Sequence, residues 1–150
     1  MINKFTKIII FALLFCFLLG CAPEEEPVFD ASIINSYRKA NDMGHVFIIP
    51  AVVYYEIRRG LLAVNATKQM HGFERLCEIF YIEEMTIEAW EKAAQIWAAL
   101  KTSGNTLGRD DGDVFIAAQC IVNGYTLVTD NANDFERIDG LKYINWRIPQ

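Results

Sequence analysis

The stretch from residue 110 to residue 120 constrains the fold more than any other. It reads Asp-Asp-Gly-Asp-Val-Phe-Ile-Ala-Ala-Gln-Cys, so three carboxylates are followed at once by an apolar run. A helix that is apolar on all sides is a buried helix. We therefore expect Asp113 in the first turn of a buried helix, where the exposed N–H groups favour acidic side chains. Its charge then lies at the edge of the core, where an unpaired ion is costly. Two interpretations stay open: a divalent cation bridges Asp113 to other carboxylates, or Asp113 is a helix N-cap after an Asp111-Gly112 turn.

The rest of the chain alternates between short apolar runs and longer amphipathic stretches. Residues 46–49 read Val-Phe-Ile-Ile, a continuous apolar run typical of a strand buried on both faces of a parallel sheet. Strands that alternate with helices predict an α/β fold, with a mostly parallel central sheet and helices on both faces. The expected strands are 28–30, 46–49, 80–82, 126–129 and 143–146, and the expected helices are 32–40, 51–62, 67–79, 86–103 and the buried helix ending at Gly124.

The N-terminus has the pattern of an export signal. Two lysines precede a short apolar run from Ile8 to Leu19, and Leu-Leu-Gly-Cys at residues 18–21 is similar to a bacterial lipoprotein cleavage box. The run is too short for a comfortable membrane span. We therefore expect a signal-like segment at residues 1–21 with Cys21 as the lipidated residue, a linker at 22–27, and the folded domain at 28–150. The alternative is that the apolar run is an ordinary first strand or core helix.

Charge and cysteine content limit the possible functions. The formal net charge of the 150 residues is −5, so the chain has no broad basic surface for tight nonspecific binding to nucleic acid. A nuclease that holds its substrate through metal ions and a few arginines is still compatible with this charge. Cys77 and Cys120 belong to no Cys-x-x-Cys pair, and we expect both to be small core residues of a reduced protein.

Four acidic positions are expected at one edge of the sheet. Ligands of open parallel sheets bind at the carboxyl ends of the strands. Asp30 ends the first expected strand, Asp113 begins the buried helix, and residues 129–131 follow a later strand. Glu56 has mostly apolar or small neighbours three and four positions away, so it points toward the interior. Each acid also has an ordinary explanation, as a helix cap, as a turn former, or, for Glu56, as an ion-pair partner of Arg59. Several carboxylates around one site are the oxygen ligands that Mg²⁺ or Mn²⁺ prefers.

The same positions carry a resemblance to a known family. The chain resembles PIN-domain ribonucleases, and in particular the toxin halves of VapBC-type toxin–antitoxin pairs. The likeness covers about Val28 to Trp146, and the block at 48–62 is its longest and most specific part. It is carried by Val-Phe-Asp-Ala-Ser-Ile-Ile at 28–34, Ile-Ile-Pro-Ala-Val-Val-Tyr-Tyr-Glu-Ile-Arg-Arg-Gly-Leu-Leu at 48–62, Asp-Val-Phe-Ile-Ala-Ala at 113–118, and Leu-Val-Thr-Asp-Asn at 127–131.

The resemblance implies a three-layer PIN-like fold and a metal-dependent ribonuclease. It makes Asp30, Glu56 and Asp113 the acids that bind Mg²⁺ or Mn²⁺, and it makes Asn131, with Thr129 beside it, the fourth site position. It also implies an RNA substrate, a homodimer, a small antitoxin that blocks the groove, and action in the cytoplasm. Further carboxylates near the site, with no role assigned, are Asp110, Asp111, Asp130 and Asp134.

The leading hypothesis is therefore a metal-dependent endoribonuclease, the toxin component of a toxin–antitoxin system. One alternative is an envelope-anchored lipoprotein, attached to the membrane through Cys21, that serves as a binding module with an inactive PIN-like fold. Another is a DNA nuclease, because the same metal chemistry cuts either polymer. The compartment follows from this choice: the cytoplasm for the toxin, and the envelope for a chain lipidated at Cys21.

Overall fold

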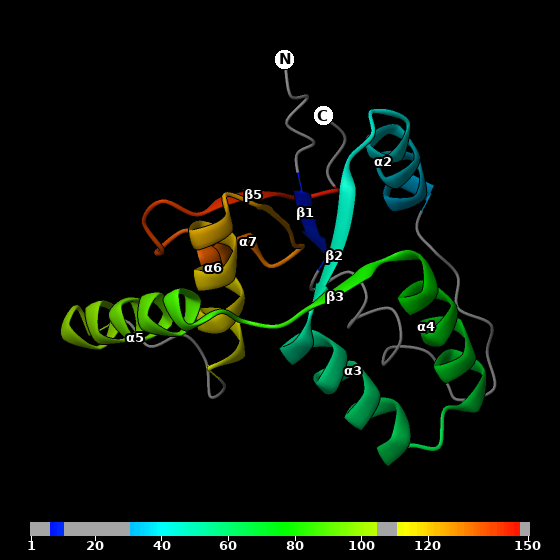
Figure 1. Ribbon diagram of the computed structural model, residues 1–150, viewed down its shortest axis with the longest axis horizontal. Helices are drawn as coiled ribbons and strands as arrows, with labels where there is room; N and C mark the ends of the chain where they lie inside the picture. Colours follow the sequence, from blue (N-terminus) through cyan, green and yellow to red (C-terminus); the bar gives the residue numbers. More distant parts are fainter. Residues whose placement is uncertain (1–6, 11–30, 105–110, 148–150) are drawn as a thin grey trace.

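The fold is built on a five-stranded parallel sheet with helices packed around it (Figure 1). The computed structural model describes residues 7–10, 31–104 and 111–147. The strands lie in the order β3-β2-β1-β4-β5, and all four neighbouring pairs are parallel. The predicted α/β class with a parallel sheet is thus confirmed. The strands are β1 (Lys7–Ile10), β2 (Val46–Pro50), β3 (Tyr81–Glu83), β4 (Thr126–Val128) and β5 (Lys142–Ile144).

The central strand differs from the one expected from the sequence. β1 pairs with β2 through Ile8 and Phe47, and with β4 through Ile8 and Thr126, so it occupies the middle of the sheet. Its four residues belong to the segment that the sequence analysis assigned to an export signal, whereas the strand expected at 28–30 lies outside the described residues. Within the described residues the sheet therefore begins at Lys7, upstream of the domain start expected at Val28. Apolar β-branched residues suit a central strand as well as a signal, which is why the sequence pattern did not separate the two.

The helices agree closely with the expected ranges. α5 begins after Thr86, whose hydroxyl oxygen accepts a hydrogen bond from the backbone N–H of Ala89 (3.3 Å). α6 ends at Gly124, which adopts the left-handed conformation (φ 68°) that glycine allows at a helix end. In Figure 1, α5 and α6 lie on one side of β1 and β2, and α2 and α4 lie on the other. The helices are α2 (Ala31–Asp42), α3 (Ala51–Ala63), α4 (Thr67–Ile79), α5 (Ile87–Thr102), α6 (Gly112–Asn123) and α7 (Ala132–Phe135).

The core confirms the two buried elements predicted from the sequence. Four consecutive residues of β2, from Phe47 to Pro50, are buried, as expected for a strand covered on both faces. α6 buries Gly112, Val114 and the whole run from Ile116 to Cys120. α5 buries one face only: Ala89, Ala93, Ile96 and Leu100 face the core, whereas Trp90 and Trp97 are about half exposed.

Both described cysteines are free thiols. Cys120 is buried in α6, and burial raises the pKa of its thiol. Cys77 is partly buried, and desolvation raises its pKa as well. Among the described residues, no helix is both long enough and apolar enough to cross a bilayer.

A carboxylate at the end of β3 ties this edge strand to α6. Glu83 accepts hydrogen bonds from the side-chain amide of Gln119 (3.0 Å) and from the hydroxyl of Tyr125 (3.0 Å). Gln119 is fully buried, so these bonds form in a region of low dielectric constant, where they fix α6 relative to the sheet.

We expect Tyr125→Phe to lower the free energy of unfolding by about 1–3 kcal/mol, because the Glu83 carboxylate loses a charge-assisted hydrogen bond. Urea denaturation measures the change. Tyr81→Phe is the matched control, since Tyr81 is 68% exposed and the loss of its hydroxyl should cost little. Equal stability of the Tyr125→Phe variant and the wild type would contradict a stabilising role for this bond.

Candidate metal site

Because all strands of the sheet are parallel, their carboxyl ends lie along the same side of it, which is called the carboxyl edge here. α3 begins at Ala51, immediately after β2, so Glu56 lies in the second turn from that edge. α6 runs back to the start of β4, so its first turn lies at the same edge as the end of β4. The topology therefore brings Glu56, the start of α6 and the residues after β4 to the same end of the sheet.

The carboxylate of Glu56 lies directly against the start of α6. Glu56 is only 9% exposed, which confirms that it points inward. The structure leaves no room between the two helices at this point: a Cβ atom built on Gly112 would lie 2.7 Å from Glu56 Oε1. A buried carboxylate at a helix N-terminus is stabilised by the unpaired backbone N–H groups and by the helix dipole.

Asp113 is the second residue of α6 and lies in its first turn. The N-cap position belongs to Asp111, whose side chain makes no capping hydrogen bond. The interpretation of Asp113 as the N-cap was therefore wrong, whereas its predicted place at the start of a buried helix is confirmed. Since Asp113 follows Gly112 directly, two carboxylates, those of Glu56 and Asp113, belong to the same helix start.

The loop after β4 is held by its own side chains. Thr129 is fully buried, and its hydroxyl oxygen accepts a hydrogen bond from the backbone N–H of Asn131 (3.1 Å). The side-chain amide of Asn131 donates to the Asp134 carboxylate, and Asn131 itself is exposed. Thr129 therefore shapes the loop that presents Asn131. Asp130 forms an ion pair with Arg147 (3.3 Å), which gives it a partner outside the carboxylate group.

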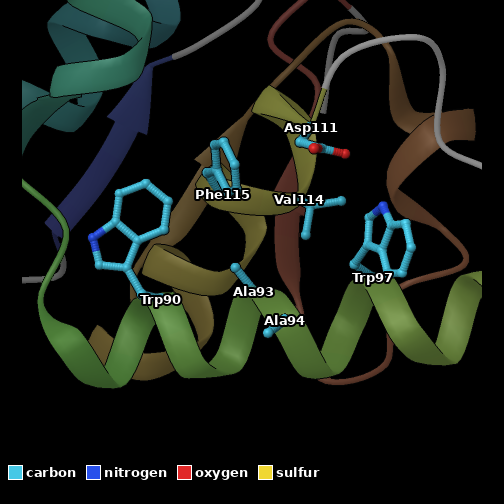
Figure 2. Close-up of a pocket in the computed structure, with 7 residues that line it drawn as sticks. All are labelled: Trp90, Ala93, Ala94, Trp97, Asp111, Val114 and Phe115. Atoms are coloured by element: carbon cyan, nitrogen blue, oxygen red, sulfur yellow. The ribbon is translucent and has the colours of Figure 1, made fainter.

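Asp111 faces a different surface from Glu56. It lines an apolar groove of about 380 Å³ between α5 and α6, at the end nearer Trp97 (Figure 2). Trp90 packs edge-on against Phe115 (4.9 Å between ring centroids) at the other end of this groove. The remaining lining residues are Ala93, Ala94 and Val114. A groove with one carboxylate and an apolar lining is not a site for a hard cation, so Asp111 is separate from the candidate metal site.

The Glu56 carboxylate thus lies against Gly112, the residue that precedes Asp113, and two other predicted acids are outside the described residues. Asp30 and Asp110 belong to that undescribed part of the chain. Within residues 7–10, 31–104 and 111–147, no group of three or more acidic, cysteine or histidine side chains could by itself hold a metal ion. The donors that are described, Glu56 and Asp113, are hard oxygen ligands of the kind that fits Mg²⁺ or Mn²⁺. Gly112 was expected only as part of a turn, and its contact with Glu56 has no local signal in the sequence.

Comparison of the sequence with models of known protein families identifies the family of this chain. The family model of the PIN domain matches residues 24–141. The chain therefore belongs to the PIN-domain family. The matched region begins downstream of β1, and it contains Asp30, Glu56, Asp113 and Asn131.

Within this family the chain is similar to VapC proteins. It is 33% identical over 126 residues to Ribonuclease VapC1 of Methanocaldococcus jannaschii, covering 79% of this chain and 87% of the relative. It is 27% identical over 136 residues to VapC ribonuclease Y4jK of Sinorhizobium fredii, covering 79% and 95%.

Solved structures of similar fold are toxin–antitoxin complexes. VapBC2 from Rickettsia felis, bound to a DNA fragment from its promoter, has a TM-score of 0.78 and 19% identity, over 94% of this chain and 99% of that chain. VapBC-1 from nontypeable Haemophilus influenzae has a TM-score of 0.77 and 17% identity, over 95% of this chain and 100% of that chain. At these identities the likeness establishes the fold.

Proposed function

We propose that this chain is a metal-dependent endoribonuclease, the toxin component of a toxin–antitoxin system, and that it hydrolyses RNA phosphodiester bonds. The observation that carries the proposal is the Glu56 carboxylate, buried against the first turn of the helix that bears Asp113. Burying a carboxylate beside a second one is unfavourable without compensation, and a divalent cation supplies more of it than a helix dipole alone. The ribonuclease names of the similar VapC proteins support the same conclusion.

Asp30, Glu56 and Asp113 would hold a Mg²⁺ or Mn²⁺ ion, which when bound activates water and neutralises charge on the phosphodiester. The chain's own residues have distinct tasks around it. Glu56 presents a carboxylate from a buried, fixed position, and Asp113 adds a second at the helix start. Asn131 lies on the loop that Thr129 shapes, exposed to solvent, where its amide can orient a water molecule or a phosphate oxygen.

The proposed partners follow from the same relatives. The similar folds were solved as toxin–antitoxin complexes, which supports a small antitoxin as the cognate partner. A homodimer is the proposed assembly. The pairing of Lys7–Ile10 with β2 and β4 supports retention of these residues in the folded chain, and so favours the toxin over the envelope-anchored alternative.

Cleavage of matched oligonucleotides tests the proposal. We expect the purified chain to cut RNA in the presence of Mg²⁺ or Mn²⁺, and to leave DNA of the same sequence intact. EDTA should reduce cleavage to the background of buffer alone, and excess Mg²⁺ should restore it, because the metal supplies the activated water. Undiminished cleavage in EDTA would contradict the metal-dependent assignment, and preferential cutting of the DNA would select the DNA nuclease.

A further inference from the structure

Gly112, the first residue of α6, lies against the side chain of Glu56 from α3. An alanine Cβ at this position would lie 2.7 Å from Glu56 Oε1 and 3.6 Å from Glu56 Cδ. Real Cβ atoms do not tolerate a contact of 2.7 Å, so the Glu56 carboxylate would have to move. Because this carboxylate ends a flexible side chain, it would rotate away while the backbones of the two helices stay in place.

Backbone conformation does not account for this glycine. Of the described glycines, those with positive φ are Gly44, Gly104, Gly124 and Gly140, and Gly112 is not among them. A glycine within a helix also costs stability relative to alanine, because the unfolded chain has more conformational freedom. The described structure shows one constraint that a side chain at this position would violate, the contact with Glu56.

We propose that Gly112 is a positioning residue for the candidate metal site. Its missing side chain lets the Glu56 carboxylate rest on the first turn of α6, so that the Glu56 oxygens are held beside the residue that follows, Asp113. The contact belongs to this chain's structure, and its role at the site rests on the proposed function. Gly112 acts on the metal only through the place it leaves for Glu56.

Gly112→Ala tests the proposal, and Gly72→Ala is the matched control. Gly72 lies inside α4, and nothing lies within 4 Å of a Cβ built on it. We expect Gly112→Ala to weaken Mn²⁺ binding, measured by calorimetry or electron paramagnetic resonance, by about 10-fold or more. Gly72→Ala should leave Mn²⁺ affinity unchanged. Unchanged affinity in Gly112→Ala would overturn the positioning role.

A double-mutant cycle with Glu56→Ala supplies a second readout. On the Glu56→Ala background, Gly112→Ala should cause no further loss of Mn²⁺ affinity, because the side chain through which it acts is gone. In metal-free buffer, the Tm change caused by Gly112→Ala should be less favourable in the wild-type background than on the Glu56→Ala background by roughly 2 °C or more, because in the wild type Glu56 must leave the helix start. Equal Tm changes on both backgrounds would show that residue 112 and Glu56 are not coupled, and would overturn the positioning role.

The two readouts separate failure of this inference from failure of the proposed function. A wild-type chain that binds no Mn²⁺ and cuts no RNA would overturn the proposed function, and the role of Gly112 at the metal with it. The metal-free cycle would still decide whether Gly112 and Glu56 are coupled. Normal Mn²⁺ binding by wild type and Gly112→Ala alike would leave the proposed function intact and overturn only the inference.

Discussion

Asp113→Asn is expected to lower metal-dependent RNA cleavage by at least about 100-fold while leaving the fold intact. Asparagine has the same shape as aspartate, so the start of α6 keeps its packing, but the charge that holds a hard cation is lost. Steady-state cleavage of a labelled RNA in Mg²⁺ or Mn²⁺ measures the effect. Circular dichroism in EDTA should give the same spectrum for both chains, because the substitution acts on the metal and not on the buried face of α6.

Thermal unfolding gives a second measure of the same substitution. A ligand that binds only the folded state raises its stability by mass action, so Mn²⁺ at about 100 times its Kd should raise the Tm of the wild type by roughly 5–10 °C. The Tm of Asp113→Asn should respond little to Mn²⁺.

Asp111→Asn is the matched control for both measurements. It removes the same charge two residues away, from a side chain that lines the α5–α6 groove. This variant should cut RNA and respond to Mn²⁺ as the wild type does. Full activity of Asp113→Asn, or equal losses in both variants, would contradict the assignment of Asp113.

The sequence was sufficient to predict the elements whose local signals agree with their burial. α6 combines an acidic start, an apolar run and a terminal glycine, and all three signals agree with its structure. β2 is a continuous apolar run, and its burial on both faces follows from that. α5 begins within one residue of the expected start at 86, where Thr86 caps it. In each case hydrophobic periodicity and capping chemistry favour the same conformation, which is why local reasoning succeeded.

Contacts between distant residues were beyond local reasoning. The contact of Gly112 with Glu56, like the ion pair of Asp130 with Arg147, joins residues with no common pattern in the sequence. The half exposure of Trp90 and Trp97 had the same origin, because it depends on where α6 lies along α5. Residues of a site can be nominated from their chemistry, but the packing that fixes their side chains follows from the tertiary fold.

The N-terminal apolar run is the place where one sequence pattern supports two exclusive structures. As β1, residues 7–10 pair with a strand on each side, so removing them would leave β2 and β4 without their shared neighbour. As a lipoprotein signal, the same residues would be cleaved off before Cys21. A chain processed in that way would lose the centre of its sheet. The two assignments therefore predict opposite results for the stability of the folded domain.

Ile9→Pro is expected to lower the free energy of unfolding by on the order of 3 kcal/mol or more. Ile9 is in register with Ile48 of β2 on one side and with Leu127 of β4 on the other. Its backbone N–H therefore faces a neighbouring strand whether it points toward β2 or toward β4. Proline removes that donor and fits only edge strands or bulges. Chemical denaturation followed by far-ultraviolet circular dichroism measures the loss. Ile9→Val keeps the N–H and the β-branched side chain, so it should change the free energy of unfolding by about 1 kcal/mol.

A chain that starts at Cys21 should lose cooperative unfolding altogether. If that chain unfolded with the stability of the full chain, another segment would have to fill the centre of the sheet, and the assignment of residues 7–10 as β1 would be wrong.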